Sequence, residues 1–138
     1  MKGIYENIKS MKPADLIKSL FDSNATKNPK YRSRIGEFYG FIEDQGIEIF
    51  EVPHAHLKKT FGGDYVGWRQ GNKIYVATDK NGRKLKEDEM MAIVGHEYMA
   101  GFNHEKSDKE AQKGAIDLFS ALGYAPAFAQ AVAINERM

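Results

Sequence analysis

The chain has 138 residues, of which 42% are hydrophobic and 28% charged, as expected for a single globular domain. Its 20 basic and 19 acidic residues leave a formal charge of +1, so neither nucleic acid nor an anionic membrane is expected as the main partner. Because the chain contains no cysteine, disulfides and thiolate metal sites are excluded, and a transition metal must be held by histidine and carboxylate.

The N-terminal segment is interrupted by lysines and a proline, and it has no apolar run of signal-peptide length. No segment approaches the roughly 18 apolar residues that a membrane-spanning helix needs. We therefore expect a cytoplasmic protein that does not cross a membrane and that is a monomer or a weak homo-oligomer.

The N-terminal third, 1–46, is predicted to be helical. Apolar residues recur at spacings of three and four over 13–21, where Pro13 suits a first helical turn, and again over 31–46. Gly46 is expected to end the second of these helices.

A small antiparallel or mixed sheet is predicted over 47–79. The segment 47–52 alternates imperfectly between apolar and polar residues, and "GWRQGNKIYVA" contains two strands with Gly71-Asn72 at the turn between them. Asn81-Gly82 marks a second turn.

Three helices are expected over 87–138. The first has acidic residues at its start and Gly101 as its stop, the second begins with a Ser107–Glu110 capping box, and the last starts at Pro126. Helices, a small sheet and helices again predict one α+β domain over 1–138.

The first of these C-terminal helices carries His96 and Glu97, with Ala100 four residues after the histidine. In H-E-x-x-H, the two histidines lie one turn apart on one face and bind a zinc ion, while the glutamate reaches a metal-bound water as general base. With Ala100, the helix supplies one ligand and one base. Read alone, the pair is more often an ordinary core or surface histidine and a solvated glutamate.

Residues 64–130 together resemble the gluzincin zinc metallopeptidases, and the small members called minigluzincins are similar in length. Their pattern is an edge strand, an H-E-x-x-H helix, and a second helix that supplies a glutamate ligand. That second helix carries E-x-x-x-D or E-A-D and is followed by G-Y-D-P. Here "EAQ" at 110–112 and "GYAP" at 123–126 stand in those places.

The resemblance implies a zincin-like fold, zinc as cofactor, and a peptide or protein substrate bound along an edge strand within 73–79. It implies His96 as the first zinc ligand, Glu97 as general base and Glu110 as the third ligand. Ala100 occupies the position of the second histidine, and Gln112 replaces an aspartate. The capping box gives Glu110 an alternative role.

Other histidines are weaker candidates. His104 follows His96 by eight residues, about 12 Å along a continuous helix, but a chain that turns back at Gly101 could bring it to the site. His54 and His56 would point the same way on a strand and could bind a metal together.

The predicted function is therefore that of a zinc-dependent metallopeptidase domain that hydrolyses peptide bonds, present here in an inactive or impaired form. Ala100 is either a natural loss or a substitution introduced to prevent self-cleavage. The alternatives are a non-catalytic pseudo-peptidase that serves as a protein-binding module, and an unrelated α+β domain with an accidental His-Glu pair.

Overall fold

The computed structural model describes residues 34–138, which form five helices, a three-stranded mixed sheet and a two-stranded hairpin. The helix predicted over 13–21 lies outside these residues. Within the described part of the chain, no helix has both the length and the apolar character needed to cross a membrane. The elements, in chain order, are α3 (Arg34–Glu43), β1 (Glu48–Val52), α4 (His54–Phe61), β2 (Gly67–Gln70), β3 (Lys73–Ala77), β4 (Asp79–Lys80), β5 (Arg83–Lys84), α5 (Glu87–Ala100), α6 (Asp108–Leu122) and α7 (Ala125–Arg137).

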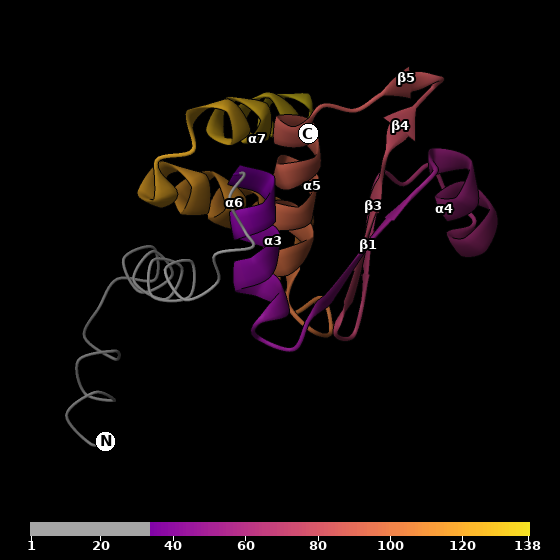
Figure 1. The fold of residues 1–138 in the computed structure, drawn as a ribbon, viewed down its shortest axis with the longest axis horizontal. Coiled ribbons are helices and arrows are strands. Elements are labelled where there is room, and N and C mark those ends of the chain that lie inside the picture. The colour runs from indigo at the N-terminus through magenta and orange to yellow at the C-terminus, as the bar shows by residue number, and fades with distance from the viewer. Residues whose placement is uncertain (1–33) are drawn as a thin grey trace.

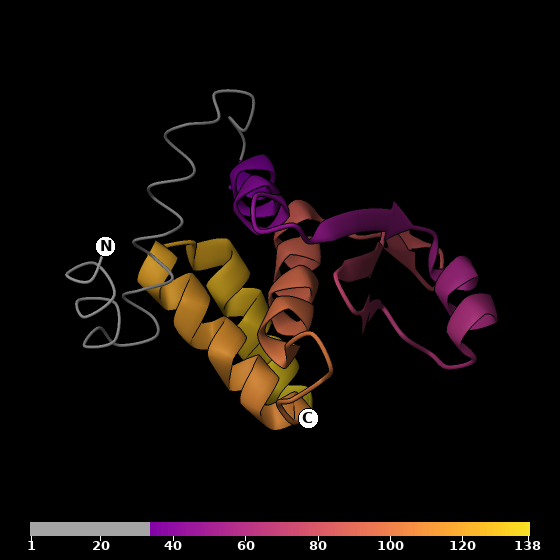
Figure 2. The same ribbon diagram turned by 90° about the horizontal axis from the view of Figure 1, so that it is seen from below.

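Helix α5 is the centre of the fold. The sheet lies on one side of it, the α6–α7 pair on the other, and α3 runs alongside (Figures 1 and 2). Because neighbours surround it, the consecutive residues Met90–Gly95 are all buried, as expected for a helix that packs on several faces. The core extends from the inner face of the sheet across α5 to α6 and α7.

The local signals for helix ends and turns are confirmed. Ser107 caps α6 by accepting a hydrogen bond from the Glu110 N–H, and Gly123 ends that helix in the left-handed conformation. Asn81 and Gly82 both have positive φ, 51° and 80°, which suits the tight turn between β4 and β5.

The sheet has the order β1-β3-β2, in which β3 is parallel to β1 and antiparallel to β2. The prediction that a strand within 73–79 forms the edge is therefore wrong, since β3 is the central strand. The chain crosses from β1 through α4 before the β2–β3 hairpin, which leaves β3 between its partners and β2 at the edge.

The segment considered as a strand around His54 and His56 is helix α4, which starts after Pro53 and ends at Gly62 with a φ of 73°. Residues two apart on a helix project about 200° apart, so the two histidines cannot share a metal ion. His54 is buried with its Nε2 2.9 Å from an Asp64 oxygen, whereas His56 is exposed. The proposed His54–His56 metal pair is wrong.

Close packing brings β2 against α5 at Gly67. A Cβ atom at this position would lie 2.5 Å from Ile93 Cγ2 and 3.2 Å from Glu97 Cγ, so only glycine fits without a shift of the helix side chains. The backbone of the edge strand therefore lies directly beside the Glu97 side chain.

Candidate functional site

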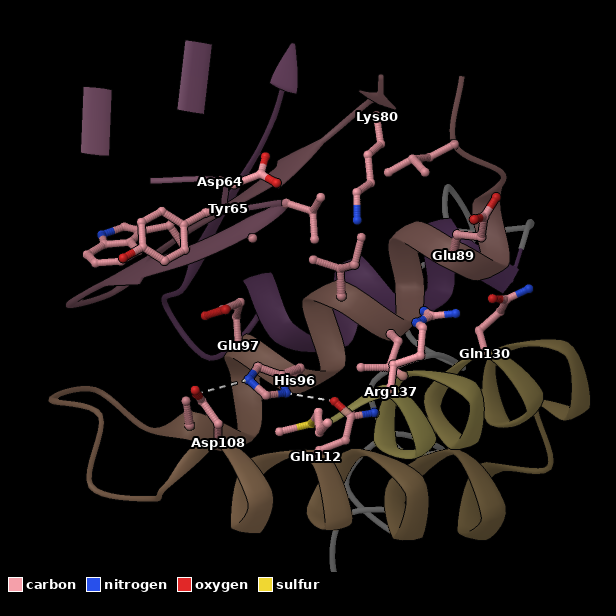
Figure 3. A pocket seen from close by; sticks show the side chains of 18 of the residues that line it. Asp64, Tyr65, Lys80, Glu89, His96, Glu97, Asp108, Gln112, Gln130 and Arg137 are labelled. Atoms are coloured by element: carbon pink, nitrogen blue, oxygen red, sulfur yellow. Dashed lines mark hydrogen bonds and ion pairs between the residues drawn. The ribbon is translucent and has the colours of Figure 1, made fainter. Parts of the chain in front are cut away.

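A cavity of about 1020 Å³ opens between β2, α5, the start of α6 and the end of α7, with the β4–β5 hairpin at one end (Figure 3). The structure brings four of the predicted site residues to its wall: His96, Glu97, Ala100 and His104. Glu110 does not line this cavity. The sequence-predicted residues thus converge on one place, with that exception.

Two hydrogen bonds of Gln112 place a proton on His96 Nδ1. The Gln112 Nε2 group donates to the Ala131 carbonyl at 2.7 Å, which leaves Gln112 Oε1 facing His96 Nδ1, also at 2.7 Å. Because an amide oxygen only accepts, Nδ1 carries a proton, and Nε2 is the ring nitrogen left to face the cavity. Gln112 is fully buried, so this orientation is held by the core.

The Nε2 atom of His96 faces the cavity and the Asp108 carboxylate. His96 Nε2 lies 3.5 Å from Asp108 Oδ1, and the two side chains are 18% and 86% exposed. Figure 3 shows His96 between Asp108 and Gln112, with one interaction on each ring nitrogen. A histidine whose Nδ1–H is held by a protein oxygen and whose Nε2 faces a cavity has the geometry of a metal ligand or of a group that exchanges a proton with a substrate.

Glu97 lies one residue further along α5, beside Gly67. Burial raises the pKa of the Glu97 carboxyl, and the nearby His96 and His104 partly oppose this. A buried carboxyl with a raised pKa in a cavity is a candidate for accepting and releasing a proton.

His104 reaches the same cavity because the chain turns back after Gly101, whose φ is 88°. Its Nε2 lies 2.8 Å from the Arg69 carbonyl oxygen, which can only accept, so Nε2–H is the donor. The Arg69 side chain in turn donates to the Glu97 and Tyr98 carbonyls at the end of α5. His104 and Arg69 thus tie the edge strand to the helix.

Ala100 is 4% exposed and presents only a methyl group to the cavity. Over residues 34–138, no group of three or more His, Asp or Glu side chains is placed to hold a metal ion together. His96 and Asp108 supply two potential ligands where a tetrahedral zinc site with one open position needs three. The residues present therefore do not fit a zinc ion as the chain stands.

Glu110 instead serves the start of α6. Its side chain is exposed and its Oε1 accepts a hydrogen bond from the Ser107 hydroxyl at 3.1 Å. Sequence reasoning missed Asp108, although a usable signal was present. The E-x-x-x-D spacing coincides with Asp108 and Gln112, which lie four apart on one helix face, and both of these residues contact His96.

The outer edge of β2 is partly open. Val66 C=O accepts from Ala77 N–H, and hydrogen-bonded pairs alternate in antiparallel sheets, so Gly67 opposite Val76 is a non-hydrogen-bonded pair. The N–H and C=O of Gly67 therefore point away from β3. At the other end of the strand, His104 covers the Arg69 carbonyl.

An ion pair between Arg83 and Glu89 lies at the cavity end that is farther from His96 and Asp108. Arg83 forms two hydrogen bonds of 2.9 Å to the two oxygens of Glu89, and this contact is the main reason that the pKa of Glu89 falls to about 2. Glu89 also accepts from the Lys86 N–H at the start of α5.

We expect Glu89→Gln to destabilise the fold in a pH-dependent manner. The folded-state pKa of Glu89 lies below its unfolded value of about 4.3, so its stabilisation is complete above that pH and lost as pH falls towards 2. Urea unfolding at pH 7 and at pH 2.5 measures this. The deficit of the variant should be clearly smaller at pH 2.5 than at pH 7, since most of the stabilisation is lost between about pH 4.3 and pH 2; an equal deficit at both values contradicts the ion-pair explanation.

Comparison with protein-family models, curated proteins and solved structures gives no match to this chain.

Proposed function

We propose that the chain is a zinc-metallopeptidase domain of gluzincin type in an inactive or impaired form, whose cavity still binds an extended peptide along β2. The observation that carries the proposal is His96. Its Nδ1–H is fixed by buried Gln112, and its Nε2 faces the cavity beside Asp108, next to Glu97. Such an orientation is what a ligand histidine requires.

Peptide binding is supported by the position of β2. An extended peptide can add to a strand edge through main-chain hydrogen bonds, and the open Gly67 groups lie beside Glu97 in the cavity wall. A peptide bond held there would lie next to the carboxyl group suited to proton transfer. Since alanine at position 100 offers no ligand, hydrolysis is expected to be absent or weak.

Hydrogen exchange at single amides tests the peptide-binding part. We expect a pool of random hexapeptides to slow exchange of the Gly67 amide, since its N–H points to the open edge. The Trp68 amide is the internal control because Trp68 forms a hydrogen-bonded pair with Tyr75 and is protected with or without peptide.

The outcomes separate the alternatives. Protection of Gly67 with slow cleavage of the peptides, detected by mass spectrometry, identifies an impaired enzyme. Protection without cleavage identifies a non-catalytic peptide-binding module. If millimolar peptide leaves the Gly67 amide unchanged, the peptide-binding proposal is wrong.

A further inference from the structure

The cavity end nearest the β4–β5 hairpin carries two positive side chains without a carboxylate partner. Lys80 and Arg137 line the cavity, and no described Asp or Glu lies within ion-pair distance of either. Arg83 differs, because Glu89 neutralises it. In Figure 3 the Lys80 amino group points towards the middle of the pocket, and Arg137 enters from the α7 side.

The wall between these cations is apolar. Leu85 and Ile93 are buried at 6% and 8% exposure, and Val66 and Ile134 line the same part of the cavity. Lys80 and Arg137 are themselves exposed, so their charges attract an anion at the rim, while the apolar wall beside them offers a contact for an apolar group. The surroundings favour an anion attached to an apolar group.

The opposite end of the cavity is different in charge. Glu97 and Asp108 line it, both near His96. The cavity is therefore polarised along its length, from the histidine–carboxylate end to the Lys80–Arg137 end. A bound ligand would be oriented by this difference.

The direction of β2 determines which end of a peptide meets the cations. Gly67 lies at the start of β2, and the residue before it, Val66, is hydrogen-bonded to Ala77. Ala77 lies two residues before the β4–β5 hairpin that carries Lys80. Gln70, at the end of β2, lies near His104. A peptide antiparallel to β2 therefore runs from His104 towards Lys80, with its carboxyl-terminal side at the cations.

We propose that Lys80 and Arg137 bind a carboxylate on the carboxyl-terminal side of the bound peptide, adjacent to an apolar residue held by Leu85 and Ile93. This proposal rests on the proposed peptide-binding function. The carboxylate comes either from the end of the peptide chain or from an acidic side chain, since both present the same two oxygens to a lysine and an arginine.

Peptide affinity measured by Trp68 fluorescence tests the proposal, since Trp68 is the only tryptophan and lines the cavity. Three hexapeptide sets share a leucine at the fifth position: one with a free carboxyl terminus, one amidated, and one amidated with glutamate at the sixth position. We expect at least about tenfold tighter binding for one or both carboxylate sets than for the plain amide, and weaker binding at 0.5 M salt.

Two variants and a matched control locate the effect. Lys80→Gln and Arg137→Gln should each reduce the preference for carboxylate, while Lys84→Gln should leave it unchanged, because Lys84 is exposed on the same hairpin and does not line the cavity. If only the free-acid set binds more tightly, the site recognises the carboxyl terminus of the peptide. If only the glutamate set binds more tightly, it recognises an acidic side chain. Equal affinities for all three sets overturn the proposal.

A small probe separates this proposal from the peptide-binding function. N-acetyl-leucine carries the carboxylate and the apolar group but cannot pair along β2 as a strand, and N-acetyl-leucinamide is its neutral control. If N-acetyl-leucine binds in a Lys80- and Arg137-dependent manner but hexapeptides leave the Gly67 amide unprotected, the carboxylate site stands and the peptide function fails. If peptides protect Gly67 without regard to carboxylates, only the carboxylate site fails.

Discussion

Replacing Ala100 with histidine is expected to give stoichiometric zinc binding. Position 100 lies one helical turn from His96 and lines the same cavity, so the new imidazole could bind one zinc ion together with His96 Nε2. Together with Asp108, this completes a set of three protein ligands. Loss of a supporting hydrogen bond alone costs roughly 10–100-fold in metal affinity, so a directly bonded ligand should tighten zinc binding by more than about 100-fold.

Isothermal titration with zinc measures the affinity, and Met99→His is the matched control. This variant adds the same imidazole one residue away on α5, where the side chain packs against Gly114 and does not line the cavity. If Ala100→His binds zinc no more tightly than Met99→His, the gluzincin assignment must be abandoned. Peptide hydrolysis by Ala100→His that Glu97→Gln removes would identify the scaffold of an impaired peptidase.

The third ligand can be assigned in the same background. Asp108 lies 3.5 Å from His96 Nε2, whereas Glu110 is bonded to Ser107 and does not line the cavity. Asp108→Asn combined with Ala100→His should lose most of the gained zinc affinity. Glu110→Gln in that background should keep the affinity, and the opposite result would support the role that the family motif implies for Glu110.

The parts of the fold that were predicted from sequence depend on neighbouring residues. Gly101 and Gly123 end helices because they adopt positive φ, and Ser107 starts one because its hydroxyl accepts a nearby N–H. The helices before and after the sheet, and the Gly71-Asn72 turn between β2 and β3, follow from such local rules. His96 and Glu97, which the family resemblance places at one site, both line the cavity.

The parts that were missed depend on contacts distant in sequence. Nothing in β3 itself indicates that β1 pairs with its other side, because that depends on the crossover through α4. The choice between Asp108 and Glu110 depends on how α6 docks against α5. Gln112 replaces the aspartate of the family motif, and the structure shows its amide donating to the buried Ala131 carbonyl, 19 residues away. An aspartate could not supply this donor while ionised.

Gln112→Leu is expected to cost roughly 1–3 kcal/mol of folding free energy, because at nearly unchanged volume it leaves the His96 Nδ1–H without its acceptor and removes the second hydrogen bond of the buried Ala131 carbonyl. In a chain of this size the melting temperature should fall by roughly 10 °C. Gln130→Leu is the control: its amide bonds to Asp88 in a partly exposed position, so a loss below about 1 kcal/mol is expected.

Gln112→Glu separates the two hydrogen bonds of this residue. A glutamate can still accept from His96 Nδ1–H, but when ionised it cannot donate to the Ala131 carbonyl. The variant should therefore keep the His96 proton on Nδ1, visible in the imidazole nitrogen chemical shifts, while the fold is destabilised. In Gln112→Leu, the same shifts should show a mixture of the two tautomers. If His96 keeps one tautomer in Gln112→Leu, then Gln112 does not orient the ring, and the main support for a ligand role of His96 is lost.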